Sequence, residues 1–166
     1  AEIEHIADGL QMSAAVFARA GVPIEDLATA IALMANAGIK GSDAGTSLKQ
    51  MLLSLQAPTD KARQVLADLG VQIYDAQGKL RPFRDLIAQF NGALRGMTQE
   101  QQAAALATVF GSDAIRAANI ILAEGAGAWD RQRQAVTRSG VASELAAAQN
   151  KGLKGALDAL QSSLET

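Results

Sequence analysis

The stretch IKGSDAGTSLKQML, residues 39–52, places two glycines, a Ser–Asp pair and a threonine within six positions. Such a stretch could cradle a phosphate, expose a nucleophile or begin a helix. A phosphate-binding loop follows G-x-x-x-x-G-K-[ST], in which the lysine reaches the phosphates. Here Gly41 and Gly45 are one residue too close together, and Thr46 stands where the lysine is needed. The spacing therefore disfavours a phosphate site.

A nucleophilic site built from Ser42, Asp43 and Thr46 would need a base. The one histidine is His5, in the first predicted helix, and nothing in the sequence brings it near. A single histidine and the absence of cysteine also leave no zinc cluster. We therefore predict no catalytic, cofactor-binding or metal-binding residues, and we do not expect an enzyme.

The helix-start interpretation has support in a repeated tetrapeptide. GSDA occurs at residues 41–44 and again at 111–114, each time before a helical apolar pattern. A serine ahead of a helix accepts a hydrogen bond from a free backbone N–H, and an aspartate in the first turn suits the helix dipole. We expect Ser42 to be such a cap, and we interpret the two copies as reused cap chemistry rather than a true repeat.

Two further segments carry polar residues at close spacing. Residues 75–78, DAQG, resemble a calcium loop but lack its spaced oxygen ligands and final glutamate, so a turn is favoured. Arg131, Arg133 and Arg138 cluster beside Trp129, the single tryptophan. This cluster could contact phosphate or an acidic partner, or it could be a solvated helix face with the tryptophan as a core anchor. The net charge of −2 and pI of about 5.4 do not suggest a nucleic-acid binder.

The elements that must carry these residues are mainly helices. Aromatic residues make up only 4% of the chain, and alanine supplies much of its apolar content, which favours closely packed helices. Apolar residues recur at helical spacing in five segments. They are Ile24, Leu27, Ile31, Met34; Leu48, Met51, Leu52, Leu55; Ala62, Val65, Leu66, Leu69; Phe83, Leu86, Ile87, Phe90, Leu94; and Ala103, Leu106, Ala107, Phe110. We predict an all-α fold, a compact array of short helices.

Glycines and one threonine mark the predicted helix ends. Six glycines follow helical segments, where a left-handed cap belongs: Gly21, Gly38, Gly70, Gly111, Gly125 and Gly140. Thr59 is a predicted N-cap for the segment after Pro58. The exception to the helical pattern is VQIYDAQGKLRP, which alternates around the turn at 75–78. It predicts a small β-hairpin at about 71–81 that leans on neighbouring helices.

Both ends of the chain have an unfinished character, so we expect a single helical domain, residues 1–166, within a longer protein. Apolar runs fall short of the roughly 18 residues that a membrane helix needs, and we expect no membrane contact. Residues 141–166 predict an exit helix, and the terminal helices should be longer in the full protein. Heptad-like spacing supports this, at Leu153, Leu157, Leu160, Leu164 and at Ile3, Ile6, Leu10. These helices could pack on their own domain or self-associate in the full chain.

Four blocks in order resemble the core region of phage tail tape measure proteins. The first is residues 36–59, which match NAGIKGS-AGT-L--ML--L--PT, and the second is residues 69–82, which match LG---YDA-G-LRP. GMTQEQQAAALATVFGSDA (96–114) and AAAQNKGLKGALDALQSSLE (146–165) are similar to the third block and to the exit into a long helix. Each block alone is weak, whereas the four in order are specific.

The resemblance implies a structural module of a tape measure protein. Such proteins are long helical chains in the tail tube lumen that take part in tail assembly, tail-length determination and DNA ejection. The implied partners are further copies of the chain, the tail tube protein, tail tip proteins and tail assembly chaperones, and the implied locations are the virion and, during assembly, the host cytoplasm. It implies no catalytic residues. The alternative is a helical module that contacts DNA or an assembly partner.

Overall fold

The computed structural model describes residues 13–140, and it is mainly helical. Residues 13–19 are helical and precede the named helices. These are α2 (Ile24–Asn36), α3 (Gly41–Gln56), α4 (Asp60–Leu69), α5 (Phe83–Leu94) and α6 (Gln99–Arg138). His5, the terminal heptads and the predicted exit helix lie outside the described residues.

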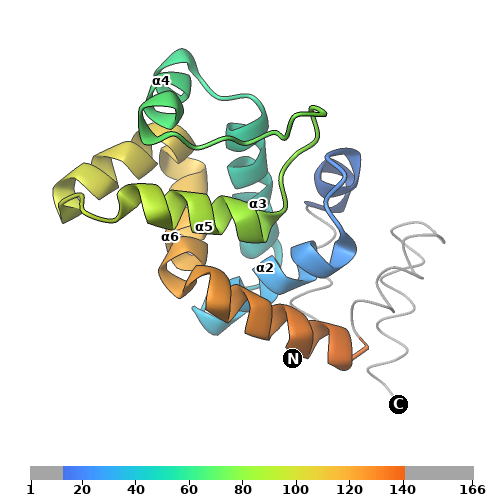
Figure 1. Ribbon diagram of the computed structural model, residues 1–166. Helices are drawn as coiled ribbons and strands as arrows, with labels where there is room; N and C mark the ends of the chain where they lie inside the picture. Colours follow the sequence, from blue (N-terminus) through green and yellow to red (C-terminus); the bar gives the residue numbers. More distant parts are fainter. Residues whose placement is uncertain (1–12, 141–166) are drawn as a thin grey trace.

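The longest helix, α6, is the centre of the fold, because α2, α3, α4 and α5 all pack against it. Its 40 residues do not form one straight rod. The backbone leaves helical geometry at Gly111 (φ 75°, ψ 179°) and at Gly125 (φ 84°, ψ 173°). Figure 1 shows α6 changing direction twice between its yellow start and its orange end. Two breaks thus let one helix reach every other named helix.

The structure confirms the positive φ predicted for these glycines but corrects the role of two of them. All six glycines have positive φ. Gly70 is the left-handed cap that the sequence predicts, with φ 73° and ψ 22°. At Gly111 and Gly125, however, ψ is near 180°, a combination essentially confined to glycine. These two residues bend a continuing helix instead of capping it.

The predicted apolar stripes of α2, α3 and α5 are buried in full. In α4, Ala62 and Leu66 are buried while Val65 and Leu69 are half-buried. The prediction for the start of α6 is partly wrong. Ala103 and Ala107 are exposed, and Ala105 and Val109 join Leu106 and Phe110 in the core. The larger Val109 gains more from burial than an alanine does, so the helix turns that face inward.

The core holds two separate aromatic groups. Phe83 contacts Phe17 and Trp129, with ring centroids 5.8 Å apart in both pairs. Phe90 of α5 contacts Phe110 of α6 at 5.6 Å. The first group joins the helical residues 13–19 to the end of α6, and the second lies just before the first break.

The predicted β-hairpin at 71–81 is wrong, because the described residues there contain a single antiparallel bridge, Tyr74 to Leu80. The turn itself is present, and the Asp75 carboxylate accepts hydrogen bonds from the N–H groups of Gln77 and Lys79, each at 2.9 Å.

Strand pairing does not extend beyond the bridge, because backbone groups of the first segment have other hydrogen-bond partners and the second segment ends at a residue without an N–H. The Val71 N–H bonds Leu66 O in the cap of α4. The Gln89 side chain accepts a hydrogen bond from the Gln72 N–H at 2.8 Å and donates one to the Gln72 carbonyl at 3.0 Å. On the other side, Pro82 has no N–H to donate.

The N-cap predictions have mixed outcomes. Thr59 caps α4 as predicted, accepting a hydrogen bond from Ala62 N at 3.1 Å. Thr98 and Gln101 form a capping box at the start of α6 that the sequence interpretation missed. Ser42 is not a cap: Lys40 is the N-cap residue of α3, and no side-chain cap hydrogen bond is made there. Gly41, with φ 61°, turns the chain one residue earlier, so Ser42 already lies inside the first turn.

By length and composition, α6 is the one described helix that could cross a membrane, with a mean hydropathy of 1.3 over its most apolar window. Packing against the other helices buries 39% of that window.

Candidate functional site: the two breaks of α6 and the polar clamp

The two GSDA copies, far apart in sequence, meet across one polar groove between α3 and α6. The groove has a volume of about 730 Å³, and its lining includes Asp43, Thr46, Asp113 and Arg116. Ser42, Asp43 and Thr46 are exposed, as are Ser112 and Asp113.

What the copies share is a backbone pattern rather than serine capping. Gly41 and Gly111 both have positive φ, and Ala44 and Ala114 are both 0% exposed. The glycine turns the chain into a helical segment, and the alanine permits close helix packing.

The break at Gly111 is supported by uncharged side chains of α3. A break in a helix frees carbonyl groups that then need new donors. The Ser54 hydroxyl shares its hydrogen between Phe110 O at 3.1 Å and Gln50 O of its own helix at 2.9 Å, and the Ser47 hydroxyl donates to Asp113 O at 3.3 Å. The two serines therefore bracket the break, one on each side.

The break at Gly125 is supported from α5. The Asn91 amide donates to Leu122 O at 3.1 Å, which satisfies a carbonyl that precedes the break. A Cβ on Gly125 would lie 3.9 Å from Asn91 Nδ2, an ordinary contact. Backbone conformation, rather than space, is what requires glycine here.

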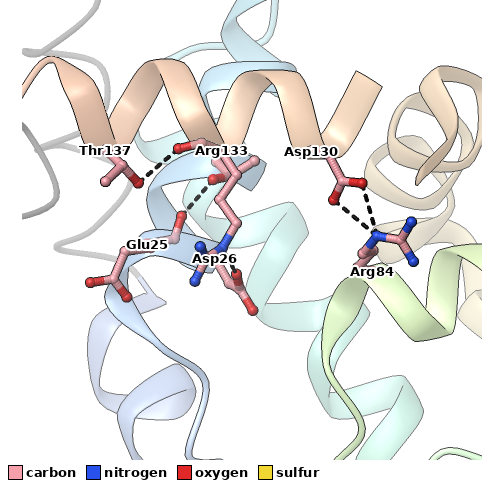
Figure 2. Close-up of polar contacts among 7 residues, drawn as sticks. Glu25, Asp26, Arg84, Asp130, Arg133 and Thr137 are labelled. Atoms are coloured by element: carbon pink, nitrogen blue, oxygen red, sulfur yellow. Dashed lines mark hydrogen bonds and ion pairs between the residues drawn. The ribbon is translucent and has the colours of Figure 1, made fainter. Parts of the chain in front are cut away.

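Beyond Gly125, a polar clamp fixes the last part of α6, residues 126–138, to α2 and α5 (Figure 2). Arg133 Nε donates to Asp26 Oδ1 at 2.8 Å. Arg84 Nε contacts both carboxylate oxygens of Asp130, at 3.0 and 2.8 Å. The Asn36 amide donates to Gln132 Oε1 at 3.1 Å.

Asp26 is the least exposed charge of this clamp, with 9% of its side chain accessible against 42% for Arg133. Burial raises the pKa of Asp26 above its ordinary value, because a carboxylate loses hydration there, and the hydrogen bond from Arg133 offsets part of this effect. The same hydrogen bond raises the pKa of Arg133. Asp26 thus depends on Arg133 for its charged form.

The structure shows where each member of the arginine cluster lies. Trp129 is 1% exposed and packs on Phe83, so it is a core anchor. Arg133 is paired with Asp26, while Arg131 and Arg138 are exposed on the helix. The cluster therefore lies on a helix face, and one of its cations, Arg133, forms an ion pair within the fold.

Residues 13–140 contain no group of three or more His, Asp or Glu side chains placed to hold a metal ion. The turn at 75–78 orders itself through Asp75, as expected for a turn rather than a calcium loop.

Sequence reasoning missed Asp26, Ser54 and Asn91. One signal was available for Asp26: α2 is apolar on nearly all sides, so a charge within it needs a partner.

The family model described as "Phage-related minor tail protein" matches residues 1–111 of the chain. The tape measure protein of Pneumococcus phage Dp-1 is 33% identical over 167 residues, which covers 100% of this chain and 14% of that protein. The probable tape measure protein of Escherichia phage P2 is 34% identical over 169 residues, which covers 99% of this chain and 21% of that protein. No solved structure matches the chain.

Proposed function

Because the chain belongs to the phage-related minor tail protein family, we propose that it is the folded module of a tape measure protein. Its role in the tail is structural. In the proposal, the module takes part in tail assembly, in determining tail length and in DNA ejection, and it has no enzymatic activity. Residues 1–166 form one helical domain of a longer chain, and residues 141–166 continue into a long exit helix.

The observation that carries the proposal is the alignment with two tape measure proteins over essentially the whole chain, at a small fraction of their length. A ruler must be extended, whereas residues 13–140 fold back around α6. An unbroken helix of the length of α6 would span about 60 Å. The module therefore adds little length, and its contribution is to organise the chain.

The proposed partners are other copies of the chain, the tail tube protein, tail tip proteins and tail assembly chaperones. The proposed locations are the tail tube lumen of the virion and the host cytoplasm during assembly, without membrane contact. The DNA-contacting alternative has less support, since the net charge is −2 and one arginine of the cluster, Arg133, is already paired with Asp26.

Deletion in the parent phage tests the proposal. Removing residues 13–140 in frame should abolish normal tails, while removing equally many residues from the extended helical part should give intact tails shorter by about 190 Å. Electron microscopy of the particles measures both. Intact tails shortened by that amount after deletion of the module would make it part of the ruler, and unchanged tails would refute an assembly role.

Salt-dependent binding to duplex DNA tests the alternative. Phosphate contacts make affinity fall steeply with salt, so a DNA-contacting module should show that slope. We expect no such binding by the 166-residue chain, and binding that the Arg131→Gln/Arg138→Gln double variant weakens would favour the alternative.

A further inference from the structure

Residues 126–138, referred to below as the arm, are joined to the rest of α6 through Gly125. At Gly125 the helix is interrupted, with φ 84° and ψ 173°. The hydrogen bond that supports this break, from Asn91 to Leu122 O, lies entirely before Gly125. This bond therefore involves no residue of the arm.

The arm is held by contacts on α2 and α5. Trp129 and Val136 are its buried apolar residues, at 1% and 4% exposure. Its ion pairs are Arg133–Asp26 and Asp130–Arg84. The second pair is the more exposed, with 54% of the Arg84 side chain and 40% of the Asp130 side chain accessible, so it is the weaker tie.

Two buried groups lie in the part of the molecule that the arm leaves. The middle segment of α6, residues 112–124, buries Ala114, Ala117, Ala118 and Ile121. Phe90 and Phe110 pack together at the other end of α5. Neither group includes an arm residue, although both belong to the hydrophobic core that also contains Trp129 and Val136.

We propose that residues 126–138 are a releasable arm, with Gly125 as its pivot and the Arg133–Asp26 pair as its latch, while α3, α5 and residues 112–124 stay folded. Release separates the buried Asp26 carboxylate from its cation and exposes Trp129 and Phe83. The arm is therefore closed at rest and opens under load or on a competing partner. Opening lets the chain beyond residue 138 move outward by about 20 Å. The inference does not depend on the proposed function.

Native-state hydrogen exchange of the 166-residue chain tests the arm directly. Amides from Trp129 to Val136 should exchange with one common opening constant, nearly independent of low denaturant, and faster than the amides of residues 112–124. Local opening has this signature. A gradient of protection that fades from Arg138 inward indicates end fraying and overturns the proposal. Equal opening constants on both sides of Gly125 indicate global unfolding and also overturn it.

Matched variants assign the latch. Arg133→Met should raise arm opening about ten-fold without changing residues 112–124, since it strands the buried carboxylate. Arg116→Met, an exposed arginine of the middle segment, is the control and should change neither region. In the cysteine-free chain, Asn36→Cys and Gln132→Cys joined by a short thiol crosslinker should remove the difference between the two segments. Arm opening that persists after crosslinking, or that Arg133→Met leaves unchanged, contradicts the latch.

Discussion

The two breaks in α6 have nearly the same backbone geometry but opposite surroundings. At Gly111, serine hydroxyls of α3 contact one carbonyl on each side of the break, and the adjoining aromatic pair is Phe90 with Phe110. At Gly125, an amide supports the carbonyl side, and ion pairs and Trp129 fix the segment on the far side of the break. The break at Gly111 is thus supported by uncharged groups, whose interactions are insensitive to salt and pH. The packing of the segment after Gly125 depends on ion pairs, which respond to both. We therefore expect the bend at Gly111 to be insensitive to salt and pH, and the arrangement after Gly125 to depend on its ion pairs.

The largest expected effects come from the aromatic residue beside each break. Trp129→Ala and Phe110→Ala should each lower the free energy of unfolding by about 3–5 kcal/mol, because both side chains are buried. Trp129→Ala should also lower the denaturant slope m, since its native state has lost the packed arm. Urea unfolding followed by circular dichroism measures both quantities. Equal slopes for the two variants would remove the distinction between the joints.

Alanine at either break should cost about 1–3 kcal/mol, because the combination of φ and ψ at Gly111 and Gly125 is strained for any residue with a Cβ. The space is not limiting, since nothing lies within 4 Å of a Cβ on Gly111. Gly92, inside α5 and equally open, is the control: Gly92→Ala should stabilise by about 0.5–1 kcal/mol. Thermal unfolding compares the three, and a tolerated Gly111→Ala would mean that the bend is not obligatory.

The charged joint should respond to loss of its cation in a pH-dependent way. Arg133→Met should cost about 1–2 kcal/mol at pH 7, less than for a fully buried pair because Arg133 is 42% exposed. The folded-state pKa of Asp26 is raised, so its contribution to stability is present at low pH and is lost as pH rises through that pKa. The variant's deficit should therefore shrink as pH falls toward the ordinary value of 3.8.

Two companions sharpen this prediction. Asp26→Asn should lie within about 0.5 kcal/mol of the wild type at pH 7 and should flatten the pH dependence, because it removes the buried charge. Arg131→Met, which changes an exposed arginine on the same segment, should have no measurable effect. Urea titrations at several pH values decide, and a pH-independent deficit for Arg133→Met would assign its role to packing.

The smallest effects separate the joints by their response to salt. Ser54→Ala should cost at most about 1 kcal/mol at any ionic strength, since it removes a neutral hydroxyl whose hydrogen is shared between Phe110 O and Gln50 O. Arg84→Ala should cost less than Ser54→Ala, and the loss should decline with added salt because its ion pair with Asp130 is solvent-exposed. Measuring both variants at low and high salt tests the contrast, which a salt-dependent Ser54→Ala would contradict.

Local signals predicted much of this fold. The stripes of α2, α3 and α5 follow from helical periodicity, and Thr59 caps α4 because its side chain needs only a neighbour three residues away. Positive φ at the glycines is equally local.

Two of the failures involve distant parts of the chain, and the third is a local competition. The hairpin is lost because Gln89, 17 residues away, takes the backbone of Gln72. Ser42 fails as a cap because Gly41 turns the chain first. The sequence could not predict the clamp, because Asp26 and Arg133 are 107 residues apart and no short-range pattern links them.

The order of the helices along the chain also constrains how the module is made. Each earlier named helix depends on α6 for burial, yet α6 is the last of them to leave the ribosome. Until then only neighbouring pairs such as α2 with α3, or α4 with α5, can cover one another. The nascent chain therefore keeps apolar faces exposed until residue 138 or so has been synthesised, and folding then proceeds through contacts of long sequence separation. A chaperone that binds the growing chain would find its apolar sites open throughout this interval and closed once α6 has emerged.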